Sequence, residues 1–323
     1  MSDEMFSHTG SSNAGLTKEI EILVPWGIIA GKVLGDSTNP PVLCIHGWLD
    51  NCNTFDKLIP LLPCDKYYVF IDLPGHGLSS SFPVGMFYTH FDFVALINRL
   101  TDYFEWKVFS LIGHSMGGNI CCVYAGTFPE KADKLILLDV GGVYPLPMGL
   151  EVQHLRLSIK HYLQHETSNR SHKMYTFEQA KERLLGANPS LTEEAANILL
   201  ERGVKKLEDG TYRFLRDFRH NYHVPTGVYA VNGLDFLSRI TAETMHIIAD
   251  DGITKNLNAK KMEVYNYFMD DGFNDCEYYR HVEVKGKHHV HLCHPERIIH
   301  PMTSLLERPL RPGLRSESSA SKL

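Results

Sequence analysis

Residues 111–118 read Leu-Ile-Gly-His-Ser-Met-Gly-Gly, and this stretch decides the fold of the chain. An apolar run enters it, and a helical pattern leaves it at Ser115. The pattern G-x-S-x-G between a strand and a helix is typical of a tight turn that lifts a serine hydroxyl above a sheet. We expect glycine at 113 and 117 because a side chain at Gly113 or Gly117 would collide with neighbouring backbone. The sequence therefore predicts Ser115 as a nucleophile, with the backbone N–H of Met116 at the helix N-terminus as an oxyanion donor.

Strands and helices alternate on both sides of this turn. We expect apolar strands at Glu19–Pro25, Ile28–Leu34, Val42–His46, Tyr67–Asp72, Val108–Ile112 and Leu135–Asp139, with helices near Phe55–Leu62 and over Phe91–Phe104. Such alternation predicts a mostly parallel sheet with helices on both faces.

The pattern changes after Val143, where polar helical sequence runs through Glu151–His165, Thr176–Leu185 and Thr192–Arg202. Core-like sequence returns at Met245–Ala249, Ala259–Met269, Tyr279–Val284 and Pro295–Glu307. We therefore expect a disordered N-terminus (1–17), a core (18–142 and 239–308), an inserted helical cap (143–238) and a flexible tail (309–323).

Composition narrows the function classes. Hydrophobic residues make up 43% of the 323 residues and charged residues 22%, which is ordinary for a globular protein. The net charge of −6 and the lack of a basic stripe predict no nucleic-acid partner. No apolar run approaches the ~20 residues of a membrane span, so we expect none. Seven cysteines without a CxxC pair indicate reduced thiols.

The second oxyanion donor is expected in the loop that follows the strand ending at His46. Gly47 allows the backbone to approach an oxyanion, and the donor would be the N–H of Trp48 or of Leu49. Asp50 lies in the same loop; we interpret it as a solvated acid, with substrate contact as the alternative.

A serine needs a base, and histidine serves because it titrates near neutrality. Among 18 histidines, the densest cluster lies at residues 288–294, after the last expected strand and before a helix near Pro295. We predict His288 as the base, and Gly286 would let its loop bend toward Ser115. A zinc site in this cluster is the alternative, but the ligand spacing does not favour it and HExxH is absent. We expect no metal and no cofactor.

The acid that orients the histidine should lie between Ser115 and His288 in chain order. Asp250 and Asp251, after the strand Met245–Ala249, are favoured jointly. Asp139, at the end of the strand after the nucleophile helix, is the alternative. Both positions lie at the carboxyl edge of the sheet, where open α/β sheets place active sites. A third alternative is that no acid takes part.

Together these motifs resemble the α/β-hydrolase superfamily over nearly the whole chain. The resemblance rests on His46-Gly47-Trp48, on Gly113–Gly118 and on Asp72-Leu73-Pro74-Gly75-His76-Gly77-Leu78-Ser79. Superfamily members often show Gly-x-His with a proline seven residues after the histidine; Gly286, His288 and Pro295 fit, which selects His288 over His289 and His291. The resemblance implies an α/β-hydrolase fold with a mostly parallel central sheet, flanking helices and an inserted helical cap.

One position departs from the superfamily pattern. Members often read Gly-x-x-Asp after the penultimate strand, whereas this chain reads Ala249-Asp250-Asp251-Gly252 and has glycine where the acid is expected. The serine nucleophile separates the chain from relatives with an aspartate nucleophile, the haloalkane dehalogenases and epoxide hydrolases.

More narrowly, residues 46–51, Phe55-Asp56 and the terminal Ser321-Lys322-Leu323 look like the serine hydrolase-like proteins. This resemblance implies a hydrolase associated with peroxisomes. The Ser-Lys-Leu ending is a peroxisomal address, which predicts the peroxisomal import receptor as a partner and a cytoplasmic pool as the alternative location.

The predicted activity is hydrolysis of a small acyl-containing substrate, an ester or thioester, through an acyl-enzyme. A catalytically silent binding protein on the same scaffold and an acyltransferase are the alternatives. The cap would set specificity. Its aromatic residues would pack the cap onto the core or line an acyl pocket: Tyr162, Tyr175, Phe177, Phe214, Phe218 and Tyr222.

Overall fold

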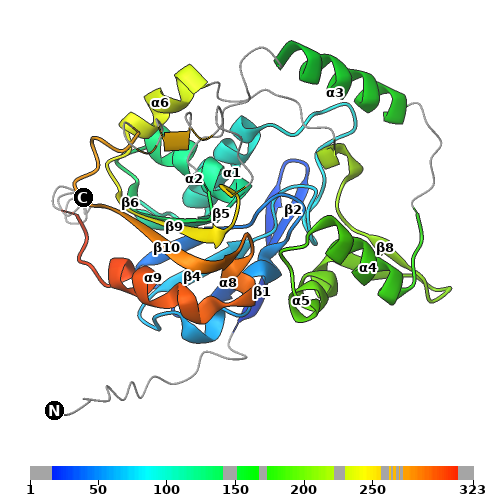
Figure 1. Ribbon diagram of the computed structural model, residues 1–323, viewed down its shortest axis with the longest axis horizontal. Coiled ribbons are helices and arrows are strands. Elements are labelled where there is room, and N and C mark those ends of the chain that lie inside the picture. The colour runs from blue at the N-terminus through cyan, green and yellow to red at the C-terminus, as the bar shows by residue number, and fades with distance from the viewer. Residues whose placement is uncertain are drawn as a thin grey trace, which may run out of the picture.

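A central sheet organises the protein, as the computed structural model shows (Figure 1). The structure describes residues 17–140, 151–166, 173–221, 230–255, 262, 265–266, 269 and 272–311. Eight strands lie in the order β1-β2-β4-β3-β5-β6-β9-β10. Their bounds are β1 Lys18–Val24, β2 Gly27–Leu34, β3 Pro41–Ile45, β4 Tyr67–Ile71, β5 Phe109–His114, β6 Ala132–Leu138, β9 Glu243–Asp251 and β10 Tyr279–Lys287.

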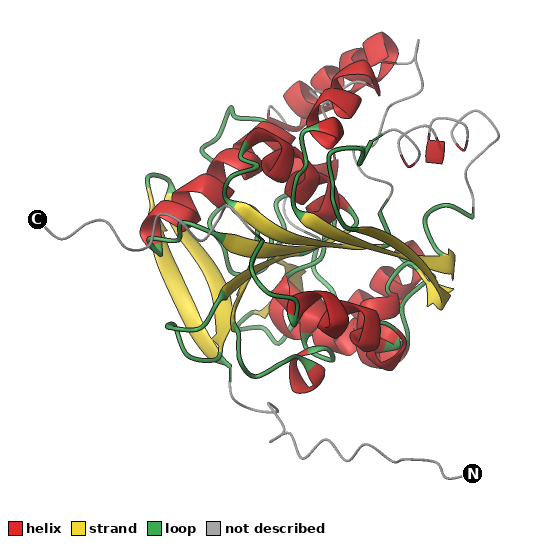
Figure 2. Ribbon diagram, turned by 90° about the vertical axis from the view of Figure 1, so that its left-hand side faces the viewer, coloured by secondary structure: helices red, strands yellow, loops and turns green. Residues whose placement is uncertain are grey.

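The direction of the strands matches the sequence pattern. β1 and β2 form an antiparallel hairpin and β2 pairs antiparallel with β4, whereas all pairs from β4 to β10 are parallel. The parallel strands β4, β5 and β6 are buried along their whole length. Helices therefore have to cover both faces, and Figure 2 shows the sheet between two helical layers.

Alternate residues of the inner strands supply two separate cores. Leu43 and Ile45 of β3 point into a cluster with α1 (His90–Tyr103), α2 (Met116–Thr127) and α6 (Ala230–Ser238). Val42 and Cys44 point into the opposite cluster, with α8 (Val290–Cys293) and α9 (Ile299–Leu306). This period of two is the geometry of a strand buried on both sides.

The segment Phe55–Leu62 does not form the single helix that the sequence predicted. Two 3-10 turns, η1 (Cys52–Phe55) and η2 (Ile59–Leu61), take its place. Pro60 lies in the first turn of η2 and has no N–H to continue a longer helix from Phe55. The apolar residues still face the core, because Phe55, Leu58, Ile59 and Leu62 are buried.

The segment between β6 and β9 is mostly helical in its described part. It contains α3 (Glu151–Glu166), α4 (Phe177–Ala187), α5 (Glu193–Gly203), the hairpin β7 (Val204–Lys206) and β8 (Tyr212–Phe214), the turn η3 (Phe218–Asn221) and α6. Thr192 caps α5 by accepting from the N–H of Ala195, at the helix start expected from the sequence. In Figure 1, α4 and α5 lie together beside the sheet, apart from α3.

Buried polar contacts tie α5 to the core. Arg202 donates through Nε to Asp72 Oδ2 at 2.6 Å, and Asp72 is fully buried at the end of β4. The side-chain amides of Asn51 and Asn53 donate to the carbonyls of Leu199 and Ile198. The loop after β3 is therefore fixed to α5. A last turn, η4 (Pro295–Arg297), precedes α9.

No helix in the described ranges is both long enough and apolar enough to cross a bilayer. Residues 1–16 of the predicted disordered N-terminus and the predicted targeting residues Ser321, Lys322 and Leu323 lie outside the described residues.

Candidate active site

Ser115 sits on a sharp turn between β5 and α2. Its φ of 50° and ψ of −117° are a conformation that side-chain-bearing residues rarely adopt, which is the backbone form of a nucleophile elbow. A Cβ at Gly113 would lie 2.6 Å from Gly117 O, and one at Gly117 would lie 2.2 Å from Ile45 O. Glycine at both positions therefore allows the tight turn and the close approach of α2 to the end of β3.

The imidazole of His288 lies against this serine. Its Nε2 is 3.0 Å from Ser115 Oγ, which is hydrogen-bonding distance between a base and a nucleophile. His288 follows β10, and Gly286 has a φ of +152° where the chain turns toward the elbow. The two residues are 173 positions apart in sequence.

The carboxylate on the other side of His288 belongs to Asp139. Its Oδ2 is 2.6 Å from His288 Nδ1, and its side chain is fully buried. The backbone N–H groups of Ala249 and Ile253 also donate to it, at 3.0 and 2.8 Å. Burial raises the pKa of Asp139, but the hydrogen bond and charge of His288 and these two amides outweigh it, so the pKa is below its ordinary value.

The preference for Asp250 and Asp251 is thereby corrected. Asp250 is exposed and accepts from the N–H of Gly286 at 2.9 Å, so it fastens the histidine loop to β9. Asp251 pairs with Lys255 at 2.7 Å on the surface. Neither carboxylate contacts His288. The physical reason is that β6 and β9 are neighbours in the sheet, so the residue after β6 reaches the same point as the loop after β9.

Gly252 explains how the acid comes from the neighbouring strand. A Cβ at Gly252 would lie 2.2 Å from Asp139 Oδ1 and 2.5 Å from Oδ2. The carboxylate of Asp139 thus fills the space that a side chain at 252 would need. The absence of an aspartate at position 252 and the presence of the acid at Asp139 therefore go together, because the two side chains would occupy the same space.

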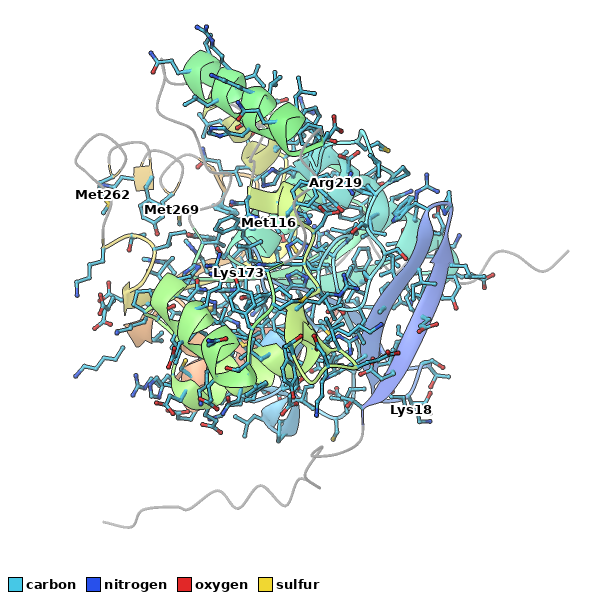
Figure 3. The ribbon with its side chains drawn as sticks, turned by 90° about the vertical axis from the view of Figure 1, so that its right-hand side faces the viewer. Lys18, Met116, Lys173, Arg219, Met262 and Met269 are labelled. Carbon is cyan, nitrogen blue, oxygen red and sulfur yellow. The ribbon has the colours of Figure 1, made fainter. Side chains whose placement is uncertain are left out.

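Two backbone N–H groups remain as candidate oxyanion donors. Within the described residues, no acceptor takes the N–H of Trp48 or of Met116, and Met116 is the first residue of α2, where N–H groups lack helical partners. Leu49, the alternative donor, gives its N–H to His76 Nε2 at 3.3 Å. In Figure 3, Met116 lies near the centre of the view.

His46 orders this loop. The N–H of Leu73 donates to His46 Nε2 at 3.0 Å, so the ring proton is on Nδ1, which donates to Gly47 O at 2.7 Å. A Cβ at Gly47 would lie 2.7 Å from His114 Nδ1, so only glycine fits between this loop and the elbow. The Trp48 indole donates to His220 O at 3.0 Å, which joins the loop to η3.

Asp50 is not the solvated acid that the sequence suggested. Only 6% of it is exposed, and its Oδ2 lies 3.2 Å from His289 Nε2 and 3.6 Å from His114 Nδ1. His114 donates through Nε2 to the carbonyl of His288 at 3.0 Å. Burial lowers the pKa of His114 to about 4 despite the nearby carboxylate, so it is neutral near pH 7. The neighbours of Ser115 and His288 thus form a buried polar cluster that the sequence did not indicate.

Most of the aromatic residues of the predicted cap are packing residues where the structure describes them. Tyr162 and Tyr175 are buried, and Phe177 and Phe214 pack against a cluster of α4 and α5 that includes Leu292. Tyr222 lies outside the described residues. Phe214 also lines a small pocket, partly open to solvent, between the loop after β3 and the helices α4 and α5. The lining includes Leu49, Leu184, Leu199, Leu200 and Arg216.

Comparison with known proteins gives matches over most of the chain. The family description "alpha/beta hydrolase fold" matches residues 40–170. The serine hydrolase-like protein of Danio rerio is 39% identical over 313 residues, which span 94% of this chain and 92% of that protein. Serine hydrolase-like protein 2 of Homo sapiens is 38% identical over 318 residues, or 92% and 97% of the two chains.

Solved structures support the same architecture. A hypothetical protein from Pseudomonas aeruginosa PAO1 superposes with a TM-score of 0.76 at 25% identity, over 89% of this chain and 97% of that one. A thioesterase domain from the curacin biosynthetic pathway superposes with a TM-score of 0.72 at 24% identity, over 90% and 98%. The second likeness concerns the fold alone.

Proposed function

The chain belongs to the α/β-hydrolase family, among the serine hydrolase-like proteins, and from this premise we propose that it hydrolyses carboxylic esters or thioesters through a serine-bound acyl intermediate. The observation that carries the proposal is the continuous hydrogen-bonded row of Ser115 Oγ, the His288 ring and Asp139 Oδ2, with contacts of 3.0 and 2.6 Å. The chain order serine, acid, histidine is that of α/β-hydrolases.

In the first half-reaction, Ser115 Oγ attacks the acyl carbonyl while its proton passes to His288 Nε2. Asp139 accepts the Nδ1 hydrogen bond, which fixes the ring tautomer and stabilises the imidazolium. The N–H groups of Met116 and Trp48 would hold the oxyanion of the tetrahedral intermediate. The intermediate collapses when His288 gives its proton to the departing alcohol or thiol, which leaves an acyl ester on Ser115.

In the second half-reaction, His288 takes a proton from water, and the resulting hydroxide attacks the acyl ester. Collapse returns the proton to Ser115 Oγ and releases the carboxylic acid. A small pocket beside Leu49 offers apolar surface to part of an acyl group, since four leucines and Phe214 line it together with Asp50, Asn51 and Arg216.

A fluorophosphonate probe tests the proposal. We expect stoichiometric labelling of Ser115 in the full-length protein, loss of labelling in Ser115→Ala and retention in the matched control Ser304→Ala, whose exposed hydroxyl bonds to Pro301 O. A screen of acyl esters and thioesters of varied chain length, with the same variants, then identifies the substrate class. A folded protein that resists the probe would favour the silent binding protein instead.

Acyl transfer to an acceptor other than water uses the same acyl-enzyme, so labelling does not separate it from hydrolysis. Product analysis with added alcohols and thiols does. Peroxisomal import through Ser321-Lys322-Leu323 stays a prediction, which the cellular location of a full-length fusion with and without these three residues would check.

A further inference from the structure

Three potential ligands from separate segments meet beside the elbow. Asp50 comes from the loop after β3, His114 from the end of β5 and His289 from the turn before α8. Asp50 Oδ2 lies 3.6 Å from His114 Nδ1 and 3.2 Å from His289 Nε2, and one ligand atom from each residue lies within 4.8 Å of the others. All three side chains are buried, with 6%, 1% and 4% exposed.

The hydrogen bonding of His114 leaves a lone pair without a partner. Its Nε2 faces the carbonyl oxygen of His288 at 3.0 Å, and a carbonyl only accepts, so Nε2 carries the ring proton. In the neutral ring Nδ1 is then an acceptor. Within the described residues this buried Nδ1 has no hydrogen-bond partner, and it points at a carboxylate oxygen, which is also an acceptor. A cation between these two atoms would satisfy both.

His289 has the second interaction that metal-bound histidines need. Its Nδ1 is 2.6 Å from Ser190 Oγ, and a hydroxyl either donates or accepts. In this structure Nε2 is hydrogen-bonded to Asp50 Oδ2 at 3.2 Å; moving the ring proton to Nδ1, with donation to Ser190 Oγ, would free Nε2 to bind an ion. A histidine ligand that donates its other N–H to an oxygen is the usual arrangement around protein-bound metals, and His114 has it as well.

The negative charge of Asp50 and the space beside Gly47 favour a positive ion between Asp50, His114 and His289. In the part of the chain that the structure describes, no lysine or arginine forms an ion pair with the buried carboxylate of Asp50. A Cβ at Gly47 would lie 2.7 Å from His114 Nδ1 and 3.3 Å from Asp50 Oδ2, so glycine keeps this corner open. Metal bonds of about 2.0–2.1 Å in a tetrahedral site place ligand atoms roughly 3.3 Å apart. The observed separations of 3.2 and 3.6 Å bracket that value.

We propose that Asp50, His114 and His289 form a binding site for a divalent transition-metal ion, with zinc as the best match to two imidazoles and one carboxylate. The sequence predicted no metal, because the ligands lie far apart along the chain and have no motif spacing. The site shares no side chain with Ser115, His288 or Asp139, yet it joins the segments that carry Ser115, His288 and the Trp48 amide.

Cobalt provides a direct readout that does not depend on hydrolysis. We expect the metal-stripped full-length protein to bind one Co²⁺ with the intense visible absorption of a tetrahedral site, and Zn²⁺ to displace it. Asp50→Asn and His289→Gln should each abolish the absorption. Ser190→Ala should weaken binding about 10- to 100-fold, because it removes the partner of a ligand and leaves the ligand itself.

Two control variants locate the ion. His294→Gln removes an exposed histidine of the same segment and should leave the absorption unchanged. His288→Gln should also retain it, which separates this site from metal bound to the proposed base. Absence of the absorption in the wild-type protein, or its persistence in Asp50→Asn or His289→Gln, would overturn the proposal. If either Asp50→Asn or His289→Gln does not fold, the absorption of the other variant tests the proposal.

Discussion

Replacing Gly252 with alanine tests the position of the acid with a single added carbon. The new Cβ would lie 2.2 Å from Asp139 Oδ1, whereas ordinary van der Waals contact begins at 3.4 Å. Gly252 does not have a positive φ, so the effect is steric and not a consequence of backbone strain. Asp139 must therefore move by roughly 1 Å, and a displacement of that size in a catalytic group costs about 100-fold in rate. That loss corresponds to about 2.7 kcal/mol of transition-state stabilisation.

The largest loss of rate expected from Gly252→Ala is that of removing the orienting carboxylate completely, which costs about 10⁴-fold in the best-studied serine triad. We expect the rate of fluorophosphonate labelling and kcat/KM for an activated ester to fall between these limits, with thermal unfolding confirming that the protein is folded. Gly186→Ala in α4 is the matched control, because its Cβ would meet nothing within 4 Å. A folded Gly252→Ala protein with a rate within threefold of wild type would refute the role of Asp139.

Three other perturbations have defined outcomes. Asp250→Asn should leave kcat/KM within about threefold and cost less than about 1 kcal/mol in urea unfolding, because its carboxylate is exposed and, among the described residues, accepts one hydrogen bond, from the Gly286 N–H; a loss comparable to that of Ser115→Ala would identify Asp250 as the acid. Gly47→Ala should lower kcat more than about tenfold in steady-state assays, since its Cβ would push the Trp48 loop away from the elbow; an unchanged kcat would exclude that amide as an oxyanion donor. Burial lowers the pKa of His220 to about 4 and of His246 to about 3, so between pH 6.5 and 4 the unfolded chain binds protons that the folded chain does not. The free energy of unfolding in urea should therefore be lower at pH 5 than at pH 7 by about 2 kcal/mol for each histidine, and equal values would contradict this.

Residues close together in the sequence were enough to predict the turn at Ser115 and the position of His288. The strained turn at Ser115 follows from glycines two residues on either side of it, and His288 follows from a glycine before it and a proline after it. Apolar runs likewise predicted the buried inner strands of the sheet. These features depend on residues close together in sequence, which a single chain displays directly.

The acid could not be chosen from sequence because the choice depends on which strand ends meet. Asp139 follows β6 and Asp250 lies near the end of β9, at the same edge of the sheet, and only the pairing of β6 with β9 brings Asp139 to His288. Asp50 was misjudged for a similar reason. A loop acid after a glycine has the sequence of a surface residue, but α5 covers this loop through the contacts of Asn51 and Asn53.

The steric conflict between Gly252 and Asp139 also limits which substitutions this backbone accepts. Carboxylates at both positions would compete for the same space, so transferring the acid to position 252 would require a simultaneous change at position 139.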